Sequence, residues 1–260
     1  MTGAAQGIGR GSALAFARAG ATVAICDLNA EKGEAVAQEC RDLGVQAKFY
    51  KLDVTNTENV RAVRDEILKD FGKISCLHSN AGISQDVFGP PLTDVPDETW
   101  EKTYAVNVFG AVKVCREFSV PMKEARYGKI VITASVAAYS QSFVMSAYSS
   151  SKLAALSVMV TLAKELGSYN INVNAVNPGF VYTPMYANEE GSKQLKSKAP
   201  ALQKFGDPHE VMAALAANSA LKREQTPEDL ANGVLFLCSD SSKEITGQVL
   251  QVDSGHICRI

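Results

Sequence analysis

Short apolar runs alternate with amphipathic stretches along most of the 260-residue chain. The apolar runs predict strands near 22–27, 46–53, 73–79, 129–135, 171–177 and 248–253. Helical periodicity predicts helices from about Gly11 to Gly20 and near 30–43, 56–71, 97–118, 148–167 and 227–238. Strands that alternate with helices form a parallel sheet covered by helices on both faces. The pattern therefore predicts an α/β fold, organised as a single domain over residues 1–260.

A glycine-rich segment, Thr2-Gly3-Ala4-Ala5-Gln6-Gly7-Ile8-Gly9, stands at the beginning of the chain, directly before a predicted helix. Such a turn lets the backbone approach a pyrophosphate, whose negative charge is favoured by the helix N-terminus. The next predicted strand ends in Asp27, eighteen residues after Gly9 and close to the spacing of a ribose-binding carboxylate. These features predict a doubly wound, Rossmann-type sheet that binds a dinucleotide.

Asp27 also bears on which dinucleotide is bound. A carboxylate at this position accepts hydrogen bonds from the ribose hydroxyls and would repel a 2′-phosphate. Gln6 adds no positive charge to the loop. The sequence therefore favours NAD over NADP as the cofactor, although Asp27 could instead be an ordinary acid at a strand end or at the N-cap of the following helix.

Tyr148 and Lys152 stand four residues apart in the predicted helix 148–167, and Ser135 ends the predicted strand 129–135. Residues four apart share a helix face, so the Lys152 ammonium would favour the Tyr148 phenolate. Removing a proton from an alcohol near neutral pH needs a base with a pKa well below that of a free phenol, about 10. Ser135 would hold the substrate oxygen beside the phenol. The set predicts an alcohol–ketone redox site, although Tyr-x-x-x-Lys alone also occurs in helices that have no catalytic function.

Together, the glycine turn and the Ser, Tyr and Lys set resemble the short-chain dehydrogenase/reductase family, and the resemblance runs from Thr2 to about Gly255. Further landmarks of that family follow in order: Leu52-Asp53-Val54, Asn80-Ala81-Gly82, Asn107, and Asn177-Pro178-Gly179 with Val181 and Thr183. The resemblance implies that Asp53 contacts the adenine and that Asn107 holds a water against Lys152. It also implies that the loop after Asn177 covers the nicotinamide.

By this resemblance, the catalytic residues are Asn107, Ser135, Tyr148 and Lys152. The expected cofactor-binding residues are Gly3, Gln6, Gly7, Ile8, Gly9, Asp27, Leu28, Asp53, Val54, Asn80, Ala81, Gly82, Tyr148, Lys152, Pro178, Gly179, Val181 and Thr183. The expected substrate-binding residues are Ser135, Ala137, Gln141, Tyr148, Gly179 and Met185.

The stretch at about 184–226 is expected to form a lid over the substrate, because lids that close over a site exclude water. A long lid together with Asp27 is similar to the sugar-alcohol and diol dehydrogenases of the family. The resemblance thus implies hydride transfer between a secondary alcohol, such as a diol or polyol, and the nicotinamide of NAD. The expected direction is oxidation of the alcohol to the ketone. Two alternatives stay open: an NADPH-dependent carbonyl or 3-oxoacyl reductase, and a non-catalytic NAD-binding scaffold.

The predicted helix 148–167 is apolar on nearly every side, which is typical of a buried helix. Since only one side can cover the sheet, the outer side needs another partner. In the resembled family that partner is the same surface of a second subunit. We therefore expect a homo-oligomer, either a tetramer or a dimer.

The first β-strand of the resembled fold is expected to be missing, because only Met1 precedes Thr2. About six residues are lacking, which at roughly 3.3 Å each is a whole strand. Its absence would leave unpaired strand edges inside the sheet. A misassigned start codon or a shortened chain would explain the difference.

Composition and charge exclude several other classes of protein. The net charge is −2 and no basic stripe is present, which argues against a nucleic-acid partner. No apolar run reaches membrane-spanning length and no leader precedes Thr2, so no membrane association and a cytoplasmic location are expected. The six cysteines and three histidines are scattered. They predict free thiols in a reducing compartment and no metal site.

Overall fold

The computed structural model describes residues 1–85, 89–140, 145–185, 193, 196–197 and 204–258. The strands are β1 (Val23–Asp27), β2 (Ala47–Lys51), β3 (Cys76–Ser79), β4 (Gly128–Thr133), β5 (Ile171–Pro178) and β6 (Val249–Val252). The helices are α1 (Gly7–Arg18), α2 (Ala30–Asp42), α3 (Thr57–Phe71), α4 (Asp97–Tyr104), α5 (Ala111–Ala125), α6 (Ser146–Leu166), α8 (Pro208–Ala216) and α9 (Pro227–Cys238).

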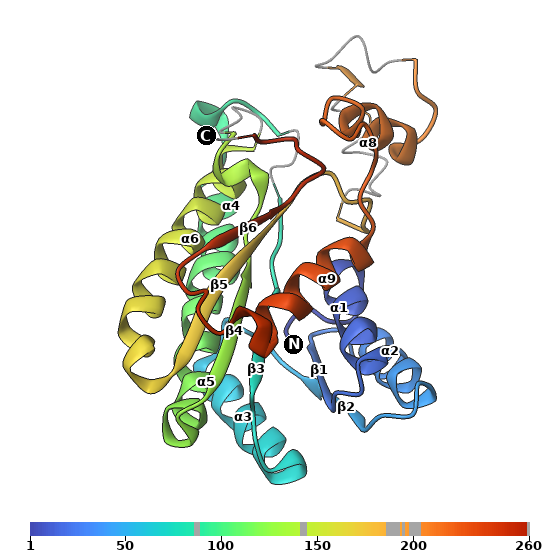
Figure 1. Cartoon of the computed structure of the whole chain (residues 1–260). Helices are drawn as coiled ribbons and strands as arrows, with labels where there is room; N and C mark the ends of the chain where they lie inside the picture. Colours follow the sequence, from blue (N-terminus) through green and yellow to red (C-terminus); the bar gives the residue numbers. More distant parts are fainter. Residues whose placement is uncertain (86–88, 141–144, 186–192, 194–195, 198–203, 259–260) are drawn as a thin grey trace.

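The paired strands are all parallel, and helices cover both faces of the sheet, so the predicted fold class is confirmed (Figure 1). The strand order is β2-β1 in one group and β3-β4-β5-β6 in the other. Buried apolar residues of α3, α5 and α6 form one core cluster on one face, and those of α1, α2 and α9 form a second cluster on the other. Because the strands are parallel, their carboxyl ends lie at a common edge, which is where ligands bind in open α/β sheets.

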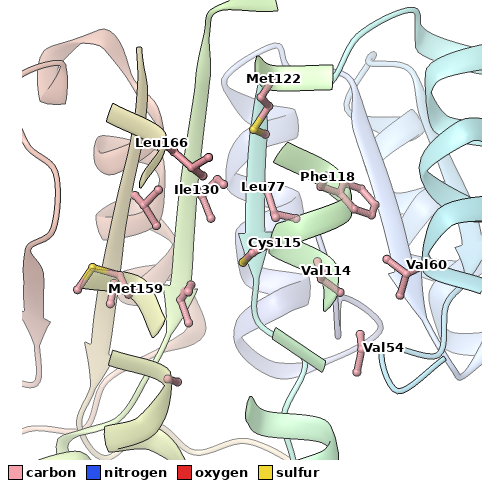
Figure 2. Packing of buried hydrophobic residues seen from close by; sticks show 14 of the residues in the cluster. Val54, Val60, Leu77, Val114, Cys115, Phe118, Met122, Ile130, Met159 and Leu166 are labelled. Atoms are coloured by element: carbon pink, nitrogen blue, oxygen red, sulfur yellow. The ribbon is translucent and has the colours of Figure 1, made fainter. Parts of the chain in front are cut away.

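The first core cluster holds β3 and β4 against α5 and α6 (Figure 2). Leu77 of β3, Ile130 of β4 and Met159 of α6 are at most 1% exposed, and Phe118 of α5 is 3% exposed. Close packing of this kind leaves little freedom for a strand to slide against a helix. It fixes the height at which the ends of β4 and α6 meet, and both carry predicted catalytic residues.

Two predicted helix boundaries differ from the structure. The helix expected over 97–118 runs on to Ala125, and Ala105–Gly110 forms a π-helical turn within it. Pro121 lies inside the helix without ending it, and Met122, the next residue, is fully buried against the core. The first helix begins at Gly7 instead of Gly11, so the second half of the glycine turn is already helical.

The expected gap lies between β1 and β3, where no strand pairs with their facing edges in the part of the chain that the structure describes. Met1 and Thr2 occupy this position. Thr2 N donates to His78 O of β3 (3.0 Å), and Cys26 N of β1 donates to Met1 O (2.9 Å). These two bonds join the halves of the sheet next to the glycine turn and so keep the turn at the carboxyl edge.

The predicted lid at about 184–226 lies partly outside the described residues. Its described part contains α8, which lies beyond the carboxyl ends of the strands (Figure 1). A role for this segment in closing over substrate stays a prediction. Within the described residues, none of the helices combines the length and apolar character needed to cross a membrane.

Candidate active site

A cleft of about 460 Å³ opens at the carboxyl edge of the sheet. Its walls include all but one of the residues predicted to bind the cofactor, the exception being Gly9. The predicted residues on the walls are Gly3, Gln6, Gly7, Ile8, Asp27, Leu28, Asp53, Val54, Asn80, Ala81, Gly82, Tyr148, Lys152, Pro178, Gly179, Val181 and Thr183.

The glycine turn has a backbone that side chains would disrupt. Gly3 and Gly7 have positive φ angles of 62° and 55°, which favour glycine. A Cβ atom on Gly9 would lie 2.1 Å from the carbonyl oxygen of Gly3, closer than any real contact. Gly9 thus lies behind the turn and allows α1 to pack closely against it.

A chain of buried hydrogen bonds connects the sheet to the glycine turn. Thr133 Oγ1 donates to Asn80 Oδ1 (3.1 Å), so the other contact of this hydroxyl, His78 Nε2 at 2.8 Å, must supply its own proton. Burial lowers the pKa of His78 to about 3, so its ring is neutral with the proton on Nε2. Asn80 Nδ2 in turn donates to the carbonyl oxygens of Thr2 (3.2 Å) and Gly3 (3.1 Å). In the sequence His78 and Thr133 each look like an ordinary strand residue, so no local pattern indicates this contact.

Asp27 is held at the end of β1 by two backbone amides. Its Oδ2 accepts from Ala5 N (3.0 Å) and its Oδ1 from Asn29 N (3.0 Å). The cap of α2 is Asn29, whose side chain accepts from Lys32 N. Asp27 therefore does not cap this helix with its own side chain, and its carboxylate faces the cleft. Lys32 Nζ lies 3.4 Å from Gln6 Oε1, which places one cation at the same corner.

Asp53 lies on the cleft wall after β2, and its carboxylate also orders the local turn. Its Oδ1 accepts from the backbone N and the hydroxyl of Thr55, at 2.8 and 2.7 Å. The side chain that caps α3 is Asn56. The Asp53 side chain therefore does not cap α3.

Lys152 and Tyr148 lie on one face of α6 and are 4% and 5% exposed. Lys152 Nζ donates to Thr133 O (2.9 Å) and lies 5.7 Å from the centroid of the Tyr148 ring. Burial lowers the pKa of Lys152 to about 8. An ammonium this close to the phenol favours the phenolate, because the charge is poorly screened in a buried site.

Ser135 follows β4 and lies on the wall of the same cleft as Tyr148. Its Oγ accepts from Ala137 N (3.1 Å), which begins a short 3₁₀ turn over Val136–Ala138. This hydrogen bond uses one lone pair and leaves the hydroxyl proton for a substrate oxygen. Strand β4 and helix α6 thus bring a hydroxyl donor and a phenol to one place.

Asn107 lies in the π-helical turn and is not on the cleft wall. Its Oδ1 accepts from Ile83 N (2.8 Å), and its Nδ2 donates to Ile83 O (2.9 Å) and to Ser151 Oγ (3.0 Å). A Cβ atom on Gly82 would lie 3.2 Å from both Asn107 Oδ1 and Lys152 Nζ. Asn107 therefore lies directly behind the lysine, with only a glycine between them.

Ser151 is a residue of this site that the sequence analysis missed. Its hydroxyl donates to Tyr148 O (2.7 Å) and accepts from Asn107. It is fully buried. Ser151 thus connects the π-helical turn to the part of α6 that carries the phenol. Only its position inside Tyr-x-x-x-Lys could have pointed to it.

Only some of the residues predicted to bind the substrate line the cleft. Met185 and Gly179 line the cleft with Ser135 and Tyr148, whereas Ala137 does not, and Gln141 lies outside the described residues. Ala137 is buried behind the cleft because the 3₁₀ turn directs it into the protein. The cleft also has walls that were not predicted, formed by Cys26, Leu52, Thr55, Ile83, Val106, Thr133, Ala134 and Pro184.

The residues present fit a bound dinucleotide. The backbone of the glycine turn is free of side chains at Gly3 and Gly7, and the N-terminus of α1 supplies amide donors for a pyrophosphate. The same cleft is lined by Asp27 and by Ser135 and Tyr148. This arrangement is that of a dinucleotide-binding α/β enzyme.

Comparisons with known proteins agree with the geometry. A family model described as enoyl-(acyl carrier protein) reductase matches residues 3–256. The 3-oxoacyl-(acyl-carrier-protein) reductase FabG of Thermotoga maritima is 34% identical over 98% of this chain and 95% of its own length. The 7alpha-hydroxysteroid dehydrogenase of Escherichia coli K12 is 32% identical over 99% and 92%. The crystal structure of an NAD+-bound xylitol dehydrogenase has a TM-score of 0.85 and 32% identity, over 98% and 96%.

The chain belongs to the short-chain dehydrogenase/reductase family. It is an oxidoreductase that acts on CH–OH groups and the corresponding oxo compounds, and its family uses NAD or NADP. The resemblance deduced from the sequence is confirmed at this level.

Replacing Thr133 with valine tests the hydrogen-bond chain behind the glycine turn. The variant keeps the side-chain shape but leaves His78 Nε2 and Asn80 Oδ1 without their shared partner. A buried polar group without a partner costs about 1–3 kcal/mol. We expect the dissociation constant for the reduced cofactor to rise about tenfold, measured by fluorescence titration. Thr161→Val on the exposed side of α6 is the matched control, and equal affinity in both variants would contradict a role for the chain.

Proposed function

We propose that the protein is an NAD-dependent dehydrogenase that oxidises a small secondary alcohol, such as a diol or polyol, to its ketone. The observation that carries the choice of NAD is the Asp27 carboxylate on the cleft wall at the end of β1. Its negative charge at the ribose-binding end would repel a 2′-phosphate. Lys32, on the exposed side of Gln6, offsets this repulsion only in part because solvent screens its ammonium.

The proposed roles follow from the contacts of each side chain. Tyr148 removes the proton of the substrate hydroxyl, and Lys152 keeps the phenol acidic enough to do so. Ser135 donates a hydrogen bond to the substrate oxygen and so orients it beside the phenol. Asn107 holds the loop after Gly82 in place and faces Lys152 from behind. When bound, NAD accepts the hydride from the alcohol carbon.

The cofactor itself would be held by the residues on the other walls. Gly3, Gly7 and the first turn of α1 would bind the pyrophosphate, and Asp27 the adenosine ribose. The walls formed by Asp53 and Val54 would enclose the adenine. Pro178, Gly179, Val181 and Thr183 would cover the nicotinamide.

Replacing Asp27 with alanine is expected to shift the coenzyme preference toward NADP. The ratio of kcat/KM for NAD to that for NADP should fall at least about tenfold, because repulsion of the 2′-phosphate is removed. The measurement is initial-rate kinetics with both coenzymes. Lys32→Ala is the paired variant and should move the ratio in the opposite direction. A preference for NADP in the unmodified protein would overturn the proposed cofactor.

An NADPH-dependent 3-oxoacyl reductase is the second candidate. The similarity to the Thermotoga maritima reductase favours it, as does the Lys32 ammonium beside Gln6. A panel that pairs diols and polyols with NAD, and a short 3-oxoacyl thioester with NADPH, separates the two candidates. Absence of turnover with both, together with cofactor binding, would favour the third candidate, a non-catalytic NAD-binding scaffold.

We also propose that the chain forms a homo-oligomer, as a tetramer or dimer, through the outer side of α5 and α6. Four large apolar side chains are exposed on these two helices and on the π-helical turn that precedes α5: Phe109 of that turn (56%), Val120 (43%), Leu153 (47%) and Val160 (39%). Apolar side chains that gather on one exposed face are typical of an interface. Light scattering of the purified protein tests this, and a monomer at micromolar concentration would contradict it.

A further inference from the structure

Two of the six cysteines lie next to each other although they are far apart in the sequence. Cys76 is the first residue of β3, and Cys238 is the last residue of α9. The Sγ atom of Cys76 donates a hydrogen bond to the carbonyl oxygen of Cys238 (3.6 Å), which places the two cysteines side by side. Both are free thiols. This pair lies at the amino end of β3, whereas the cleft lies at the carboxyl edge of the sheet.

The surroundings of Cys76 favour its thiolate. Lys129 of β4 is the register partner of Cys76, so the two side chains project from the same face of adjacent strands. The hydrogen bond from Cys238 and the charge of Lys129 lower the pKa of Cys76, although burial and Asp240 oppose them. Lys129 itself is 2% exposed, and its Nζ donates to Asn172 Oδ1 (2.8 Å). Lys129 Nζ also lies 5.9 Å from the centroid of the Tyr127 ring, so two contacts hold this side chain in place.

The other cysteines with shifted pKa values differ in this respect, and the first of them is Cys238 itself, whose pKa is raised by its interaction with Cys76 and by burial. Burial raises the pKa of Cys115 to about 12, and it also raises the pKa of Cys26 and Cys40. Thiols of that kind are inert toward oxidants, because the thiolate is the reactive form. Cys76 is only partly buried, whereas Cys238 is 7% exposed. One accessible thiol with a favoured thiolate thus adjoins one enclosed thiol.

We propose that Cys76 and Cys238 form an oxidative modification site, in which a hydroperoxide oxidises Cys76 and Cys238 converts the product into a disulfide. The Cys76 thiolate attacks the peroxide, the O–O bond breaks, and Cys76 becomes a sulfenic acid. Cys238 sulfur then attacks the Cys76 sulfur and releases water, which takes up the thiol proton. Overall, two thiols lose two electrons and two protons, and one hydrogen peroxide becomes two waters.

The disulfide would join two elements that carry opposite parts of the cofactor cleft. Strand β3 leads into Asn80-Ala81-Gly82, and α9 packs along α1, which begins at the glycine turn. The bond would close a loop that spans more than half of the chain, and closing long loops restricts the unfolded state. Oxidation should therefore raise the resistance to heat without closing the cleft.

The experiment treats the reduced full-length protein with a small excess of hydrogen peroxide and then alkylates the remaining thiols. We expect a mass decrease of about 2 Da before alkylation, one hydrogen from each of the two thiols, and a cross-linked peptide that contains Cys76 and Cys238. The Tm should rise by about 5 °C or more and return after reduction. Cys258→Ser, which removes the exposed thiol near the C-terminus, is the matched control. In this variant the cross-link between Cys76 and Cys238 should form at an unchanged rate.

Two variants make the proposal falsifiable even where the disulfide itself is not seen. Cys238→Ser should leave a sulfenic acid at Cys76 that dimedone traps, whereas Cys76→Ser should leave Cys238 unmodified. Full alkylation of Cys76 after peroxide treatment, or oxidation of Cys258 alone, would overturn the proposal. These outcomes are read by mass spectrometry without substrate or cofactor, so they are independent of the proposed enzyme function.

Discussion

Replacing Tyr148 with phenylalanine is expected to lower kcat by about 10²–10⁴-fold, the usual contribution of a positioned acid or base. The change removes only the phenolic hydroxyl. The ring stays buried beside the Lys152 ammonium, whose bond to Thr133 O does not involve it. The dissociation constant for the reduced cofactor should therefore change by less than about threefold, because most of the cleft is untouched. Steady-state kinetics and fluorescence titration measure the two quantities separately.

Tyr127→Phe is the control for this variant. Tyr127 donates to Asp240 Oδ1 (3.0 Å) beside the amino end of β4, at the far end of the strand from Ser135. Its loss should leave kcat within about twofold of the original, since Tyr127 does not line the cleft. An equal loss of turnover and cofactor affinity in Tyr148→Phe would instead mean that the phenol holds the cleft together.

The sequence predicted those features of the site that depend on short-range spacing. Tyr148 and Lys152 share a face because they are four residues apart, whatever the rest of the chain does. Asp27 could be placed because it ends an apolar run that follows a glycine turn. The fold class could be inferred in the same way, from the alternation of strands and helices. Such signals survive because local geometry alone creates them.

Features that depend on tertiary contacts could not be read in this way. Ser151 and Thr133 look like ordinary small polar residues, and only packing shows that each joins two elements of the site. Ala137 is buried in the 3₁₀ turn and does not line the cleft, a placement that no spacing in the sequence indicates. The nearness of Cys76 and Cys238 arises from the packing of α9 on the sheet and has no signature in the sequence.

Lys152→Met is expected to raise the stability of the protein and to abolish its activity. Burial lowers the pKa of Lys152 from 10.5 to about 8, which corresponds to a cost of about 3 kcal/mol for the folded ammonium. Methionine is of similar length and bears no charge, so the variant avoids this cost but leaves Thr133 O without its partner. We expect a gain of about 1–2 kcal/mol in the free energy of unfolding near pH 7, together with loss of turnover.

The pH dependence identifies the ammonium as the cause of this gain. Below about pH 8 the lysine is charged in both the folded and the unfolded state, so its full cost is present. Between about 8 and 10.5 the folded state loses the proton first, and the stability of the original protein rises relative to the variant. Urea unfolding near pH 7 and near pH 10, without cofactor, should therefore show a difference that shrinks at the higher pH. Lys164→Met, at an exposed position of α6, is the control. A difference in the free energy of unfolding that is independent of pH would mean that side-chain shape, and not charge, separates the variant from the original protein. Burial of the Lys152 ammonium beside Tyr148 would then not destabilise the folded state.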